Sequence, residues 1–562
     1  MEKGQIKIPE IVLDIMKKRG IRDEDMEEYL SPKPQKAYDP FLMRGMKEGA
    51  DRIFRAVDNN EKIVIYGDYD TDGVTSTALL MRALGSYTSN LSYYIPSRMD
   101  EGYGLHSDSI RRIKDGGADL LVSVDCGATA REEVEFAHEI SLDTVITDHH
   151  NVGEKRAPGI LIDPKDESSG YPFENLAGVG VAYKLALALS AERPLPPGMK
   201  YRLLELVAIG TIGDIMPLTD ENRTIVKYGL QLINRGMGCP GISRLIEMAG
   251  LDAKTITASG LAFGVVPRIN SAGRLGDATV SVKMLLAPDR AQGEQYCRRL
   301  MEMNDRRRSL QEEAYEICMP EAEDQMKDWD FLLLEAEGVH EGILGIVAGK
   351  IKEEVRRPVV IVTPSGDEGL WKGTGRSVSG VNLYEMLNKY RDLFIHFGGH
   401  NAACGFTIDR RYIPELREGL QKDMAAIFKE DPDVFDEPVP VDEVLRVRDA
   451  DMELAESLKL FEPCGQGNEM PVMGLSGVEI RDWRFLKNGR KYARFTIFDG
   501  QGYLNAVLFH DAERIWQMAE SGDLLDVYGK LEINRWNDRC TVQMVVDGVL
   551  PSGGLRSDGS RQ

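Results

Sequence analysis

Several features that indicate a membrane or secreted protein are missing from this sequence of 562 residues. No apolar run reaches the about 18–20 residues that span a bilayer, and the first thirty residues carry charges throughout. The seven cysteines are scattered and include no Cys-x-x-Cys pair, which argues against a disulfide framework or a structural zinc site. We therefore expect a cytoplasmic protein that makes no membrane contact.

Common motifs for nucleotide cofactors and zinc hydrolases are also missing. There is no Walker A sequence, and the Gly178-x-Gly180 pair lacks the third glycine of a dinucleotide fingerprint, so we interpret it as helix packing. Glu341 follows His340 without the second histidine of a His-Glu-x-x-His motif. We expect no nucleotide cofactor.

Basic residues are in deficit, with 69 Lys and Arg against 91 Asp and Glu, and the net charge is −22. Taken alone, this balance argues against nucleic acid, because phosphates are bound by basic surface. A net charge is only a sum, however, and carboxylates gathered around metal ions make a chain acidic without repelling a substrate. The positions of the charges therefore matter more than their total.

The length predicts three or four domains, because single cores stop growing near about 250–300 residues. Short apolar runs at 62–67, 91–95, 118–124, 144–147 and 160–162 alternate with helical stretches. This alternation predicts a mostly parallel sheet covered on both faces, and so an α/β fold.

The second half of the chain is predicted to hold a long helix, another α/β block and a β-rich end. The helix covers 289–319 and is interrupted by Pro320, with Cys297, Leu300, Asn304, Leu310, Ala314 and Ile317 on one stripe. Strands at 331–334 and 359–362 then flank a helix at 345–354. An acidic, proline-containing linker follows at 430–443. Past it, strands at 493–498, 503–509, 524–531 and 540–546 indicate a small β-barrel.

These patterns divide the chain into six parts: a helical lead-in at 1–60, a first lobe at 61–288, a connecting helix at 289–327, a second lobe at 328–430, a barrel at 444–550 and a disordered tail at 551–562.

The strongest local signal is the sequence GDYDTDG at 67–73, directly after a predicted strand. Its three carboxylates point the same way if the chain is extended, and divalent cations are their natural counter-charge. An acidic turn and a calcium-binding EF-hand loop are the alternatives. The EF-hand fails because Leu79 stands where its twelfth-position glutamate belongs, and because a strand rather than a helix precedes the motif.

Two more predicted strands end in metal-binding residue types. Asp125 follows the strand at 118–124, and Asp148, His149 and His150 follow the strand at 144–147. Ligands gather at the carboxyl ends of parallel strands, so these side chains should meet at one edge. Asp214, in an apolar helical context, is a further acid. Mixed Asp and His ligands suit Mn²⁺ or Mg²⁺, and an acid shared by two ions suits phosphoester displacement.

In order and spacing, GDYDTDG, SVDCG (123–127) and TDHH (147–150) resemble the DHH phosphoesterase superfamily. Further motifs narrow the resemblance to the bacterial RecJ exonucleases: 210–217, 268–274, 339–348, 375–377, 398–400 and 461–468. The resemblance runs from about residue 60 to 550. It implies a two-lobed DHH/DHHA1 phosphoesterase core with a parallel sheet, a long connecting helix and a C-terminal OB-like barrel.

The resemblance also implies a centre of two divalent cations, Mn²⁺ or Mg²⁺. Its implied ligands are Asp68, Asp70, Asp72, Asp125, His149 and Asp214, with Asp125 bridging both ions. The catalytic residues would be Asp125, His149 and His150, with His150 near the scissile phosphate or behind the ligands. Many relatives have a histidine ligand where this chain has Tyr66, so which of the first three aspartates complete that ion's shell stays open.

Substrate contacts are expected from both lobes and from the barrel. Glycines let a backbone approach a phosphate, which a nearby Arg or His neutralises. The candidates in the lobes are Arg268, Asn270, Arg274, His340, Arg376, Ser377 and His400, with a structural helix-entry role equally open for His340.

In the barrel, residues 481–494 carry six basic residues against Asp482 alone, with aromatics interleaved, the pattern of single-strand binding on an OB-fold. The candidates are Trp483, Arg484, Arg490, Lys491 and Tyr492; Phe495 and Phe498 are assigned to the barrel core.

The function implied is 5′→3′ degradation of single-stranded DNA to mononucleotides by two-metal-ion hydrolysis, in DNA repair and recombination. Single-stranded DNA is the expected partner, with a helicase or a single-strand-binding protein as possible protein partners. Two alternatives are a DHH phosphodiesterase for short oligoribonucleotides or cyclic dinucleotides, and a catalytically inactive DNA-binding relative. The added OB-like module argues against the first, and the intact Asp and His set argues against the second.

Overall fold

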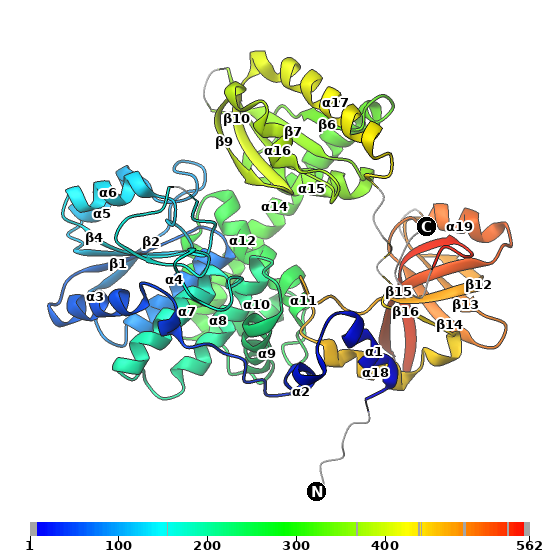
Figure 1. Ribbon diagram of the computed structural model, residues 1–562, viewed down its shortest axis with the longest axis horizontal. Coiled ribbons are helices and arrows are strands. Elements are labelled where there is room, and N and C mark those ends of the chain that lie inside the picture. Colours follow the sequence, from blue (N-terminus) through cyan, green and yellow to red (C-terminus); the bar gives the residue numbers. More distant parts are fainter. Residues whose placement is uncertain are drawn as a thin grey trace, which may run out of the picture.

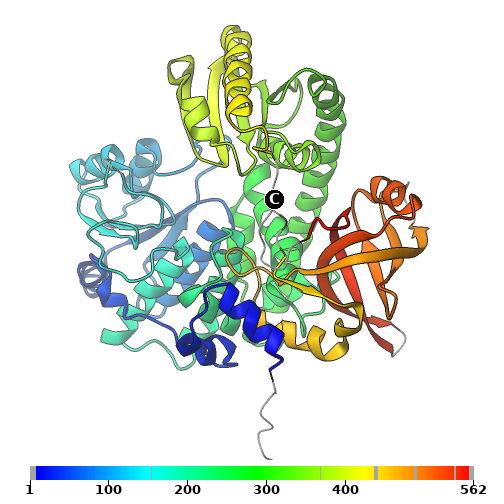
Figure 2. The ribbon, with the colours of Figure 1, turned by 45° about the vertical axis from the view of Figure 1, so that its right-hand side comes forward.

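The computed structural model describes residues 8–153, 155–366, 369–435, 439, 441–486, 490–536 and 539–555. This part of the chain forms two α/β lobes and a β-barrel, each built on its own sheet (Figure 1). In both views the second lobe stands at one end of a long helix, and the barrel lies on the side of the first lobe that carries α9 and α11 (Figures 1 and 2). No helix within the described residues has the length and apolar character needed to cross a bilayer.

The first lobe contains a parallel sheet with strand order β2-β1-β3-β4-β5. The strands are β1 (Ile63–Gly67), β2 (Leu91–Tyr94), β3 (Leu120–Val124), β4 (Asp143–Thr147) and β5 (Ile160–Ile162). Every residue of β1 and β3 is buried, because helices cover both faces. The predicted parallel sheet is confirmed. Because β1 lies between β2 and β3, the chain order reverses at β1, which opens a crevice at the carboxyl ends of the strands.

Helices surround this sheet. One face is covered by α3 (Met46–Asp58), α4 (Thr71–Leu84) and α7 (Gly178–Glu192), and the other by α5 (Ser107–Asp115) and α6 (Arg131–Glu139). The remaining helical elements of the lobe are α8 (Met199–Gly213), α9 (Asp220–Asn234), α10 (Pro240–Met248), α11 (Ala258–Gly260), the π-helical turn η3 (Leu261–Val265), α12 (Val266–Leu275) and α13 (Thr279–Leu285).

The connecting helix α14 (Arg290–Gln325) continues past Pro320, so the predicted interruption is wrong. A proline inside a helix removes one hydrogen bond and crowds the preceding turn. Tertiary contacts hold the last turn in place: the amide of Gln325 bonds both backbone groups of Leu333, at 2.8 and 3.1 Å. The predicted stripe also shifts at its end, because Ile317 is exposed and Cys318 is buried.

The second lobe holds a mixed sheet of order β6-β7-β8-β10-β9, in which only β6 and β7 run parallel. Its elements are β6 (Leu332–Glu335), η4 (Glu341–Ile343), α15 (Leu344–Val355), β7 (Val359–Pro364), β8 (Leu370–Arg376), α16 (Leu383–Asn388), β9 (Phe394–His400), β10 (Ala403–Asp409) and α17 (Ile413–Glu430). The two predicted strands and the helix between them are confirmed, and β8, β9 and β10 were not expected.

The C-terminal sheet has the order β11-β12-β13-β14-β16-β15 and closes into a barrel through a further β12–β15 pairing. Its elements are β11 (Glu443–Leu445), α18 (Met452–Leu458), β12 (Met473–Phe485), β13 (Ala493–Phe498), β14 (Tyr503–Leu508), α19 (Ala512–Glu520), β15 (Leu525–Trp536) and β16 (Arg539–Pro551). The four predicted strands are present, and β11 and β12 were missed. Phe495 is buried in the core as predicted, whereas Phe498 is half-buried and stacks on Tyr503 outside it.

Parts of the predicted linker and tail lie outside the described residues, namely 436–438, 440 and 556–562. The start of the predicted disordered tail is held by the barrel: the amides of Gly553 and Leu555 donate to the buried Asp526 carboxylate at 3.0 and 2.9 Å.

The N-terminal lead-in packs on the C-terminal barrel, although the two are far apart in sequence. The buried residues Val12, Ile15 and Met16 of α1 (Glu10–Lys18) join the barrel core. Arg19 forms a two-pronged ion pair with Asp442, at 2.7 and 2.8 Å. Figure 1 shows α1 beside α18, with α2 (Met26–Leu30) leading towards the first lobe.

Candidate active site

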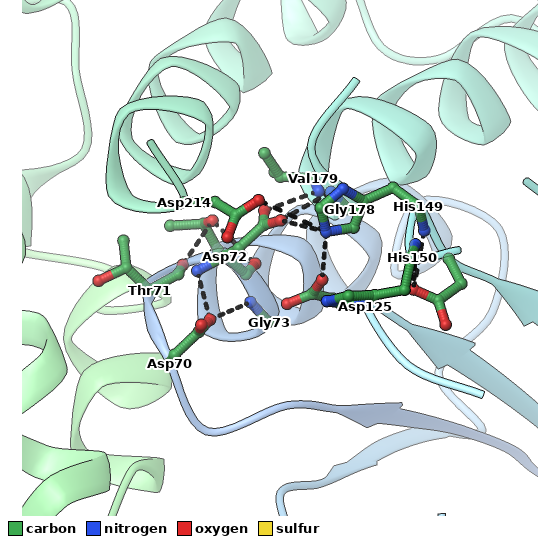
Figure 3. A network of polar contacts seen from close by, with 12 residues as sticks. Asp70, Thr71, Asp72, Gly73, Asp125, His149, His150, Gly178, Val179 and Asp214 are labelled. Carbon is green, nitrogen blue, oxygen red and sulfur yellow. Dashed lines mark hydrogen bonds and ion pairs between the residues drawn. The ribbon is translucent and has the colours of Figure 1, made fainter. Parts of the chain in front are cut away.

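The three aspartates of the 67–73 motif take separate positions, because α4 begins at Thr71 and the chain there is not extended. Asp70 caps this helix, accepting hydrogen bonds from the amides of Asp72 and Gly73 at 2.8 and 3.1 Å (Figure 3). Asp72 lies in the first turn of α4. Its carboxylate accepts hydrogen bonds from the first amides of α7, those of Gly178 and Val179, at 2.6 and 2.8 Å. The extended chain on which a common direction of the three carboxylates depended is therefore absent from this motif.

Asp125 follows β3 with a left-handed backbone, at φ +60°. Its amide donates to the carbonyl of Thr147 on β4 at 3.0 Å, which ties the two strand ends together. The start of α7 approaches closely, because a Cβ on Gly178 would lie 2.6 Å from the Asp125 Cβ. Gly178 thus serves the site, and Gly180 lies close to Leu176 in the segment just before α7.

His149 lies between three carboxylates (Figure 3). Its Nε2 is 3.2 Å from Asp125 Oδ1, 3.5 Å from Asp214 Oδ2 and 3.8 Å from Asp72 Oδ2. Burial and the neighbouring charge of His150 lower the pKa of His149 to about 3, so the imidazole is neutral and keeps a lone pair for a metal ion.

The candidate ligand atoms form three overlapping groups, each within 4.8 Å: Asp68, Asp70 and Asp125; Asp72, His149 and Asp214; and Asp125, His149 and His150. The first two groups have no member in common, and the third links them through Asp125 and His149. Asp125 lies beside His149 and so touches both groups. The first two aspartates of the motif therefore lie together, and the third lies with His149. Tyr66 points away from both groups and donates its hydroxyl to the carbonyl of Gly104 at 2.9 Å.

The chemistry of this cluster fits divalent cations. Asp68 Oδ1, Asp125 Oδ1 and His149 Nε2 are buried without a hydrogen-bond partner, a costly arrangement that a cation relieves. Burial and mutual repulsion raise the pKa of Asp68 and of Asp125 well above the usual range. The same causes raise the pKa of Asp72 to about 7 and that of Asp214 to about 8.

Asp148 orders the two histidines and is a residue whose role the sequence did not reveal. It accepts hydrogen bonds from the amides of Ala128 and His149 at 2.8 and 2.7 Å, and it contacts His150 Nδ1 at 2.8 Å. Burial alone would lower the pKa of His150, but the hydrogen bond and charge of Asp148 raise it to about 9. His150 therefore carries a positive charge at neutral pH, and its side chain is 46% exposed.

A cavity of about 420 Å³ opens over these groups. It is lined by Asp68, Tyr69, Asp70, Arg98, Tyr103, Asp125, His150, Gly213, Asp214, Asn270, Gly273 and Arg274. Burial lowers the pKa of Arg274 to about 10, and the nearby positive charges of Arg98, Arg307 and Arg376 contribute. Arginines from both lobes thus gather beside the acidic centre, which is the arrangement that binds phosphate.

Family models match the chain in three places: "DHH family, N-terminal domain" at residues 62–211, "DHHA1 domain" at 330–430 and "RecJ OB domain" at 441–548. A relative from Bacillus subtilis is 35% identical, over 98% of this chain and 69% of its own length. One from Escherichia coli is 30% identical, over 91% of each. Both are named single-stranded-DNA-specific exonuclease RecJ. The chain belongs to the RecJ family.

Solved structures of RecJ match the fold as well. The chain is similar to Thermus thermophilus RecJ in complex with Mn²⁺, with a TM-score of 0.81, 28% identity, and 98% of this chain and 78% of the other covered. The Mg²⁺ complex gives a TM-score of 0.75 at 26% identity, with 98% and 77% covered. The DHH/DHHA1 lobes, the parallel sheet and the OB barrel are thus those of this family.

In the second lobe, some residues of the RecJ-type motifs lie near the arginine cluster, and others bond within the lobe. Burial lowers the pKa of Arg376, and the nearby charge of Arg98 lowers it further. Because Arg98 is close enough to have this effect, Arg376 belongs to the arginine cluster. His400 is exposed and close to Arg376, whose charge adds to the effect of burial in lowering the pKa of His400. The Ser377 hydroxyl is buried and donates to the Val381 carbonyl at 2.7 Å. His340 accepts a hydrogen bond from the Gly342 amide at 3.1 Å, so it caps the start of η4. This is the structural helix-entry role that was the alternative to a substrate contact.

Two residues of the first lobe that were predicted to contact substrate form hydrogen bonds within the lobe instead. Arg268 donates to the carbonyl of Gly264 and is not among the residues that line the cavity. Asn270 lines the cavity, but its Oδ1 accepts from both the amide and the hydroxyl of Thr71, at 2.8 and 2.9 Å. Arg98, Tyr69 and Tyr103 line the cavity without having been predicted. Tyr69 lies within the 67–73 motif, where only the aspartates were singled out, and no spacing pattern marks the segment that carries Arg98 and Tyr103.

Several of the barrel residues predicted to bind the strand contact other residues of the barrel. Trp483 stacks on Phe495 at 4.8 Å, and Arg490 pairs with Glu513 at 3.1 Å. Tyr492 is half-buried and packs on Phe509. Arg484 and Lys491 are exposed, and Arg484 faces Arg494 directly across β12 and β13. Lys487 of the predicted basic stretch lies outside the described residues.

A second cavity of about 1280 Å³, here called the groove, connects the site with the barrel. It shares Gly213, Asn270 and Arg274 with the first cavity and reaches Lys530 and Arg535 of β15. Phe263 of η3 lines the groove and is 81% exposed. The groove thus gives the RecJ-type site an open route towards the barrel.

Proposed function

We propose that this chain is a 5′→3′ exonuclease that degrades single-stranded DNA to mononucleotides by two-metal-ion hydrolysis, in DNA repair and recombination. The observation that carries the proposal is the pair of ligand groups that meet at Asp125, beside a cluster of arginines. The names of the similar RecJ proteins support the same activity.

The proposed cofactors are two divalent cations, Mn²⁺ or Mg²⁺. Asp68, Asp70 and Asp125 would hold one, and Asp72, His149 and Asp214 the other. The unpartnered buried acceptors support this assignment, and so do the Mn²⁺ and Mg²⁺ named for the similar structures. When bound, such a pair activates water and neutralises charge that develops on the phosphate.

The remaining chemistry comes from side chains around the centre. Asp148 holds His150 in place by the bond to its Nδ1 and keeps it protonated, so that a positive charge faces the cavity. That charge would favour an anionic phosphate and its transition state. The amides at the start of α7 fix Asp72 so that it presents its carboxylate to His149.

The 5′→3′ polarity is proposed to come from the arginine cluster. Arg98 and Arg274 line the reaction cavity, and Arg376 joins them from the second lobe. Guanidinium groups bind phosphate oxygens in a two-pronged manner, so this cluster would hold the terminal phosphate while the next phosphodiester lies over the metal centre.

The groove favours a long strand over a dinucleotide. A cavity of about 420 Å³ is closed to a long substrate unless a route leads out of it, and the groove supplies that route towards the barrel. Its exposed Phe263 offers a surface on which bases stack, and Lys530 and Arg535 offer charges for the backbone.

Two finer proposals remain from the sequence. The first concerns protein partners: because the substrate is single-stranded, a helicase or a single-strand-binding protein would present it to the enzyme. The second is that the enzyme works in the cytoplasm. A mixing experiment with purified proteins tests the first: acceleration on duplex DNA only when a helicase is present supports it, and equal rates with and without helicase contradict it.

The activity is tested by digestion of end-labelled single and double strands, with Mn²⁺ and with EDTA. We expect a 5′ label to appear first as a mononucleotide, from the single strand and only with Mn²⁺. Release of a 3′ label first, or equal digestion of the duplex, would contradict the proposal. Cleavage of dinucleotides alone would favour the short-substrate phosphodiesterase.

A further inference from the structure

The motif at residues 461–468 has no part in the chemistry above, yet it joins the barrel to the first lobe. It follows α18 and the short turn η8 (Lys459–Phe461), and precedes β12. The amide of Leu218 donates to the Gln466 carbonyl at 2.7 Å. The contact is close, since a Cβ on Gly465 would lie 2.8 Å from Leu218 Cδ1. We call residues 460–468 the junction loop.

Arg223 of α9 reaches from the first lobe into this loop and is only 6% exposed. Its guanidinium lies 3.8 Å from the centre of the Tyr29 ring. It donates to five carbonyls, those of Phe461 (2.9 Å), Glu462 (3.0 Å), Leu460 (3.2 Å), Pro463 (3.3 Å) and Tyr29 (3.4 Å). The planar, fixed donors of arginine suit such a convergence, whereas a lysine ammonium cannot reach it all at once.

The charge of Arg223 is balanced by carbonyls rather than by a carboxylate. Within the described residues, no ion pair includes Arg223, and burial lowers its pKa. A buried charge is costly unless all its donors are satisfied. None of its five acceptors belongs to α9, so Arg223 is satisfied only when the first lobe, the N-terminal lead-in and the junction loop are assembled.

Asn468 bonds the same loop from the other side. Its Nδ2 donates to the carbonyls of Phe461 and Pro463 at 2.9 and 2.8 Å. Its Oδ1 accepts the Tyr29 hydroxyl at 2.6 Å. The carbonyls of Phe461 and Pro463 are thus each held by Arg223 and by Asn468.

The junction loop also forms a wall of the groove, through Glu462, Pro463, Cys464, Gly465 and Gln466. We infer that Arg223 is a positioning residue, a latch that fixes the barrel on the first lobe so that one DNA strand is held by both. This inference rests on the proposed function, in which the strand occupies the groove. Two binding elements at fixed spacing act on one strand at high effective concentration, and the gain is lost when the spacing varies.

The test compares Arg223→Met, Arg223→Lys and Asn468→Ala with a control at the opposite end of α9, Arg235→Met, whose side chain is exposed. Cleavage is measured on a strand of about 40 nucleotides and on a tetranucleotide. In parallel, spin labels on the exposed Cys540 of the barrel and on Tyr201→Cys, at an exposed position of α8, report the distance between barrel and first lobe.

We expect the Arg223 and Asn468 variants to raise KM for the long strand by about tenfold or more, with kcat and tetranucleotide cleavage near wild type. The distribution of distances between the two spin labels should broaden in these variants and stay narrow in Arg235→Met. Asn468→Ala and Arg223→Lys keep the test decisive if Arg223→Met does not fold. Unchanged distances and an unchanged long-strand KM in all three variants would overturn the latch. Broadened distances with an unchanged KM would instead contradict the proposed path of the strand.

Discussion

Asp125 is the residue on which the two ligand groups converge. Its left-handed backbone, its amide bond to Thr147 and its contact with Gly178 all fix the direction of its carboxylate. Such strain in a non-glycine residue persists where the surrounding structure holds it, often at functional sites. Asp125 is therefore the residue whose loss should cost most.

Asp125→Ala should abolish hydrolysis while affinity for single-stranded DNA stays near wild type, because the groove and the arginine cluster remain. The exposed Glu132→Ala, on α6, is the control. Turnover and oligonucleotide binding are measured on the same preparations. Retention of more than a few per cent of turnover would remove Asp125 from the shared position.

Gly178→Ala should lower turnover by about 100-fold, because its Cβ would displace Asp125 and misplacing a catalytic group by 1 Å costs about that much. Stability should fall by only about 1–3 kcal/mol, the usual cost of overpacking. Gly349→Ala on α15 is the matched control, since its Cβ would meet nothing within 4 Å. Equal kcat values for the two variants would contradict the close approach.

At this scale the sequence predicts well which side chains meet, and predicts their surroundings poorly. The motif carboxylates and His149 meet as expected, because parallel strands end at a common edge. The role of Asp148 and the presence of Arg98 in the cavity depend on loop conformation, which no local pattern encodes. The splitting of the motif between two groups follows from where α4 begins.

Secondary-structure elements supply the site's polar groups at their ends. The strand ends deliver Asp68, Asp125 and His149, while the first turns of α4 and α7 provide amides for carboxylates. On the second lobe, β8 ends at Arg376, which joins the arginine cluster. The arrangement of elements therefore brings the arginine cluster next to the acidic side chains of the cavity.

A 5′-phosphate should speed cleavage by the wild-type protein, and Arg376→Met should remove most of that advantage. His400→Ala should do so as well, because His400 lies close to Arg376. The exposed Arg410→Met, outside the cluster, is the control. Rates are compared on strands with phosphorylated and hydroxyl 5′ ends. Equal wild-type rates on both would contradict end recognition by this cluster.

The elements themselves were predictable where period and composition agree. The five strands of the first sheet and the helix between β6 and β7 fall where alternating apolar runs place them. The predicted interruption of α14 at Pro320 was wrong, because the helix is held past this residue by hydrogen bonds between Gln325 and Leu333. These bonds belong to the tertiary structure, which the local sequence does not reveal. β12 was missed because its polar and charged residues, including Arg481 and Arg484, lie on the outside of a closed barrel.

As a whole, the molecule combines an acidic chain with local basic surfaces. The carboxylates of the centre are buried, whereas Arg484 and Arg494 face each other on the outside of the barrel. Like charges directly opposite on neighbouring strands repel, which an anionic backbone would relieve. The negative net charge is therefore compatible with a nucleic acid partner.

Arg484→Gln combined with Arg494→Gln should weaken binding of long strands and flatten the salt dependence by about 1–1.5 units of log K per log salt. Cleavage of a tetranucleotide should be unchanged. The control is Arg514→Gln, an exposed arginine of α19 close to Asp511. Oligonucleotides of several lengths are titrated at several salt concentrations. An unchanged slope would show that this face of the barrel does not contact the strand.

These point variants are sharper than removal of residues 431–562. Without the barrel, the apolar face of α1, with Val12, Ile15 and Met16, would lose its cover. Arg223 would also lose its carbonyl partners in the junction loop. A truncated chain would therefore differ from the intact one in more than strand binding.

The most direct test of the account is the number of Mn²⁺ ions bound by the intact chain, measured by calorimetric titration. Two ions per chain are expected for the wild type, because two of the three groups of ligand atoms share no residue and lie side by side at Asp125. Asp68→Ala should leave one ion, and Asp125→Ala should weaken both. A single ion in the wild type, or unchanged binding in Asp125→Ala, would contradict a shared two-ion centre.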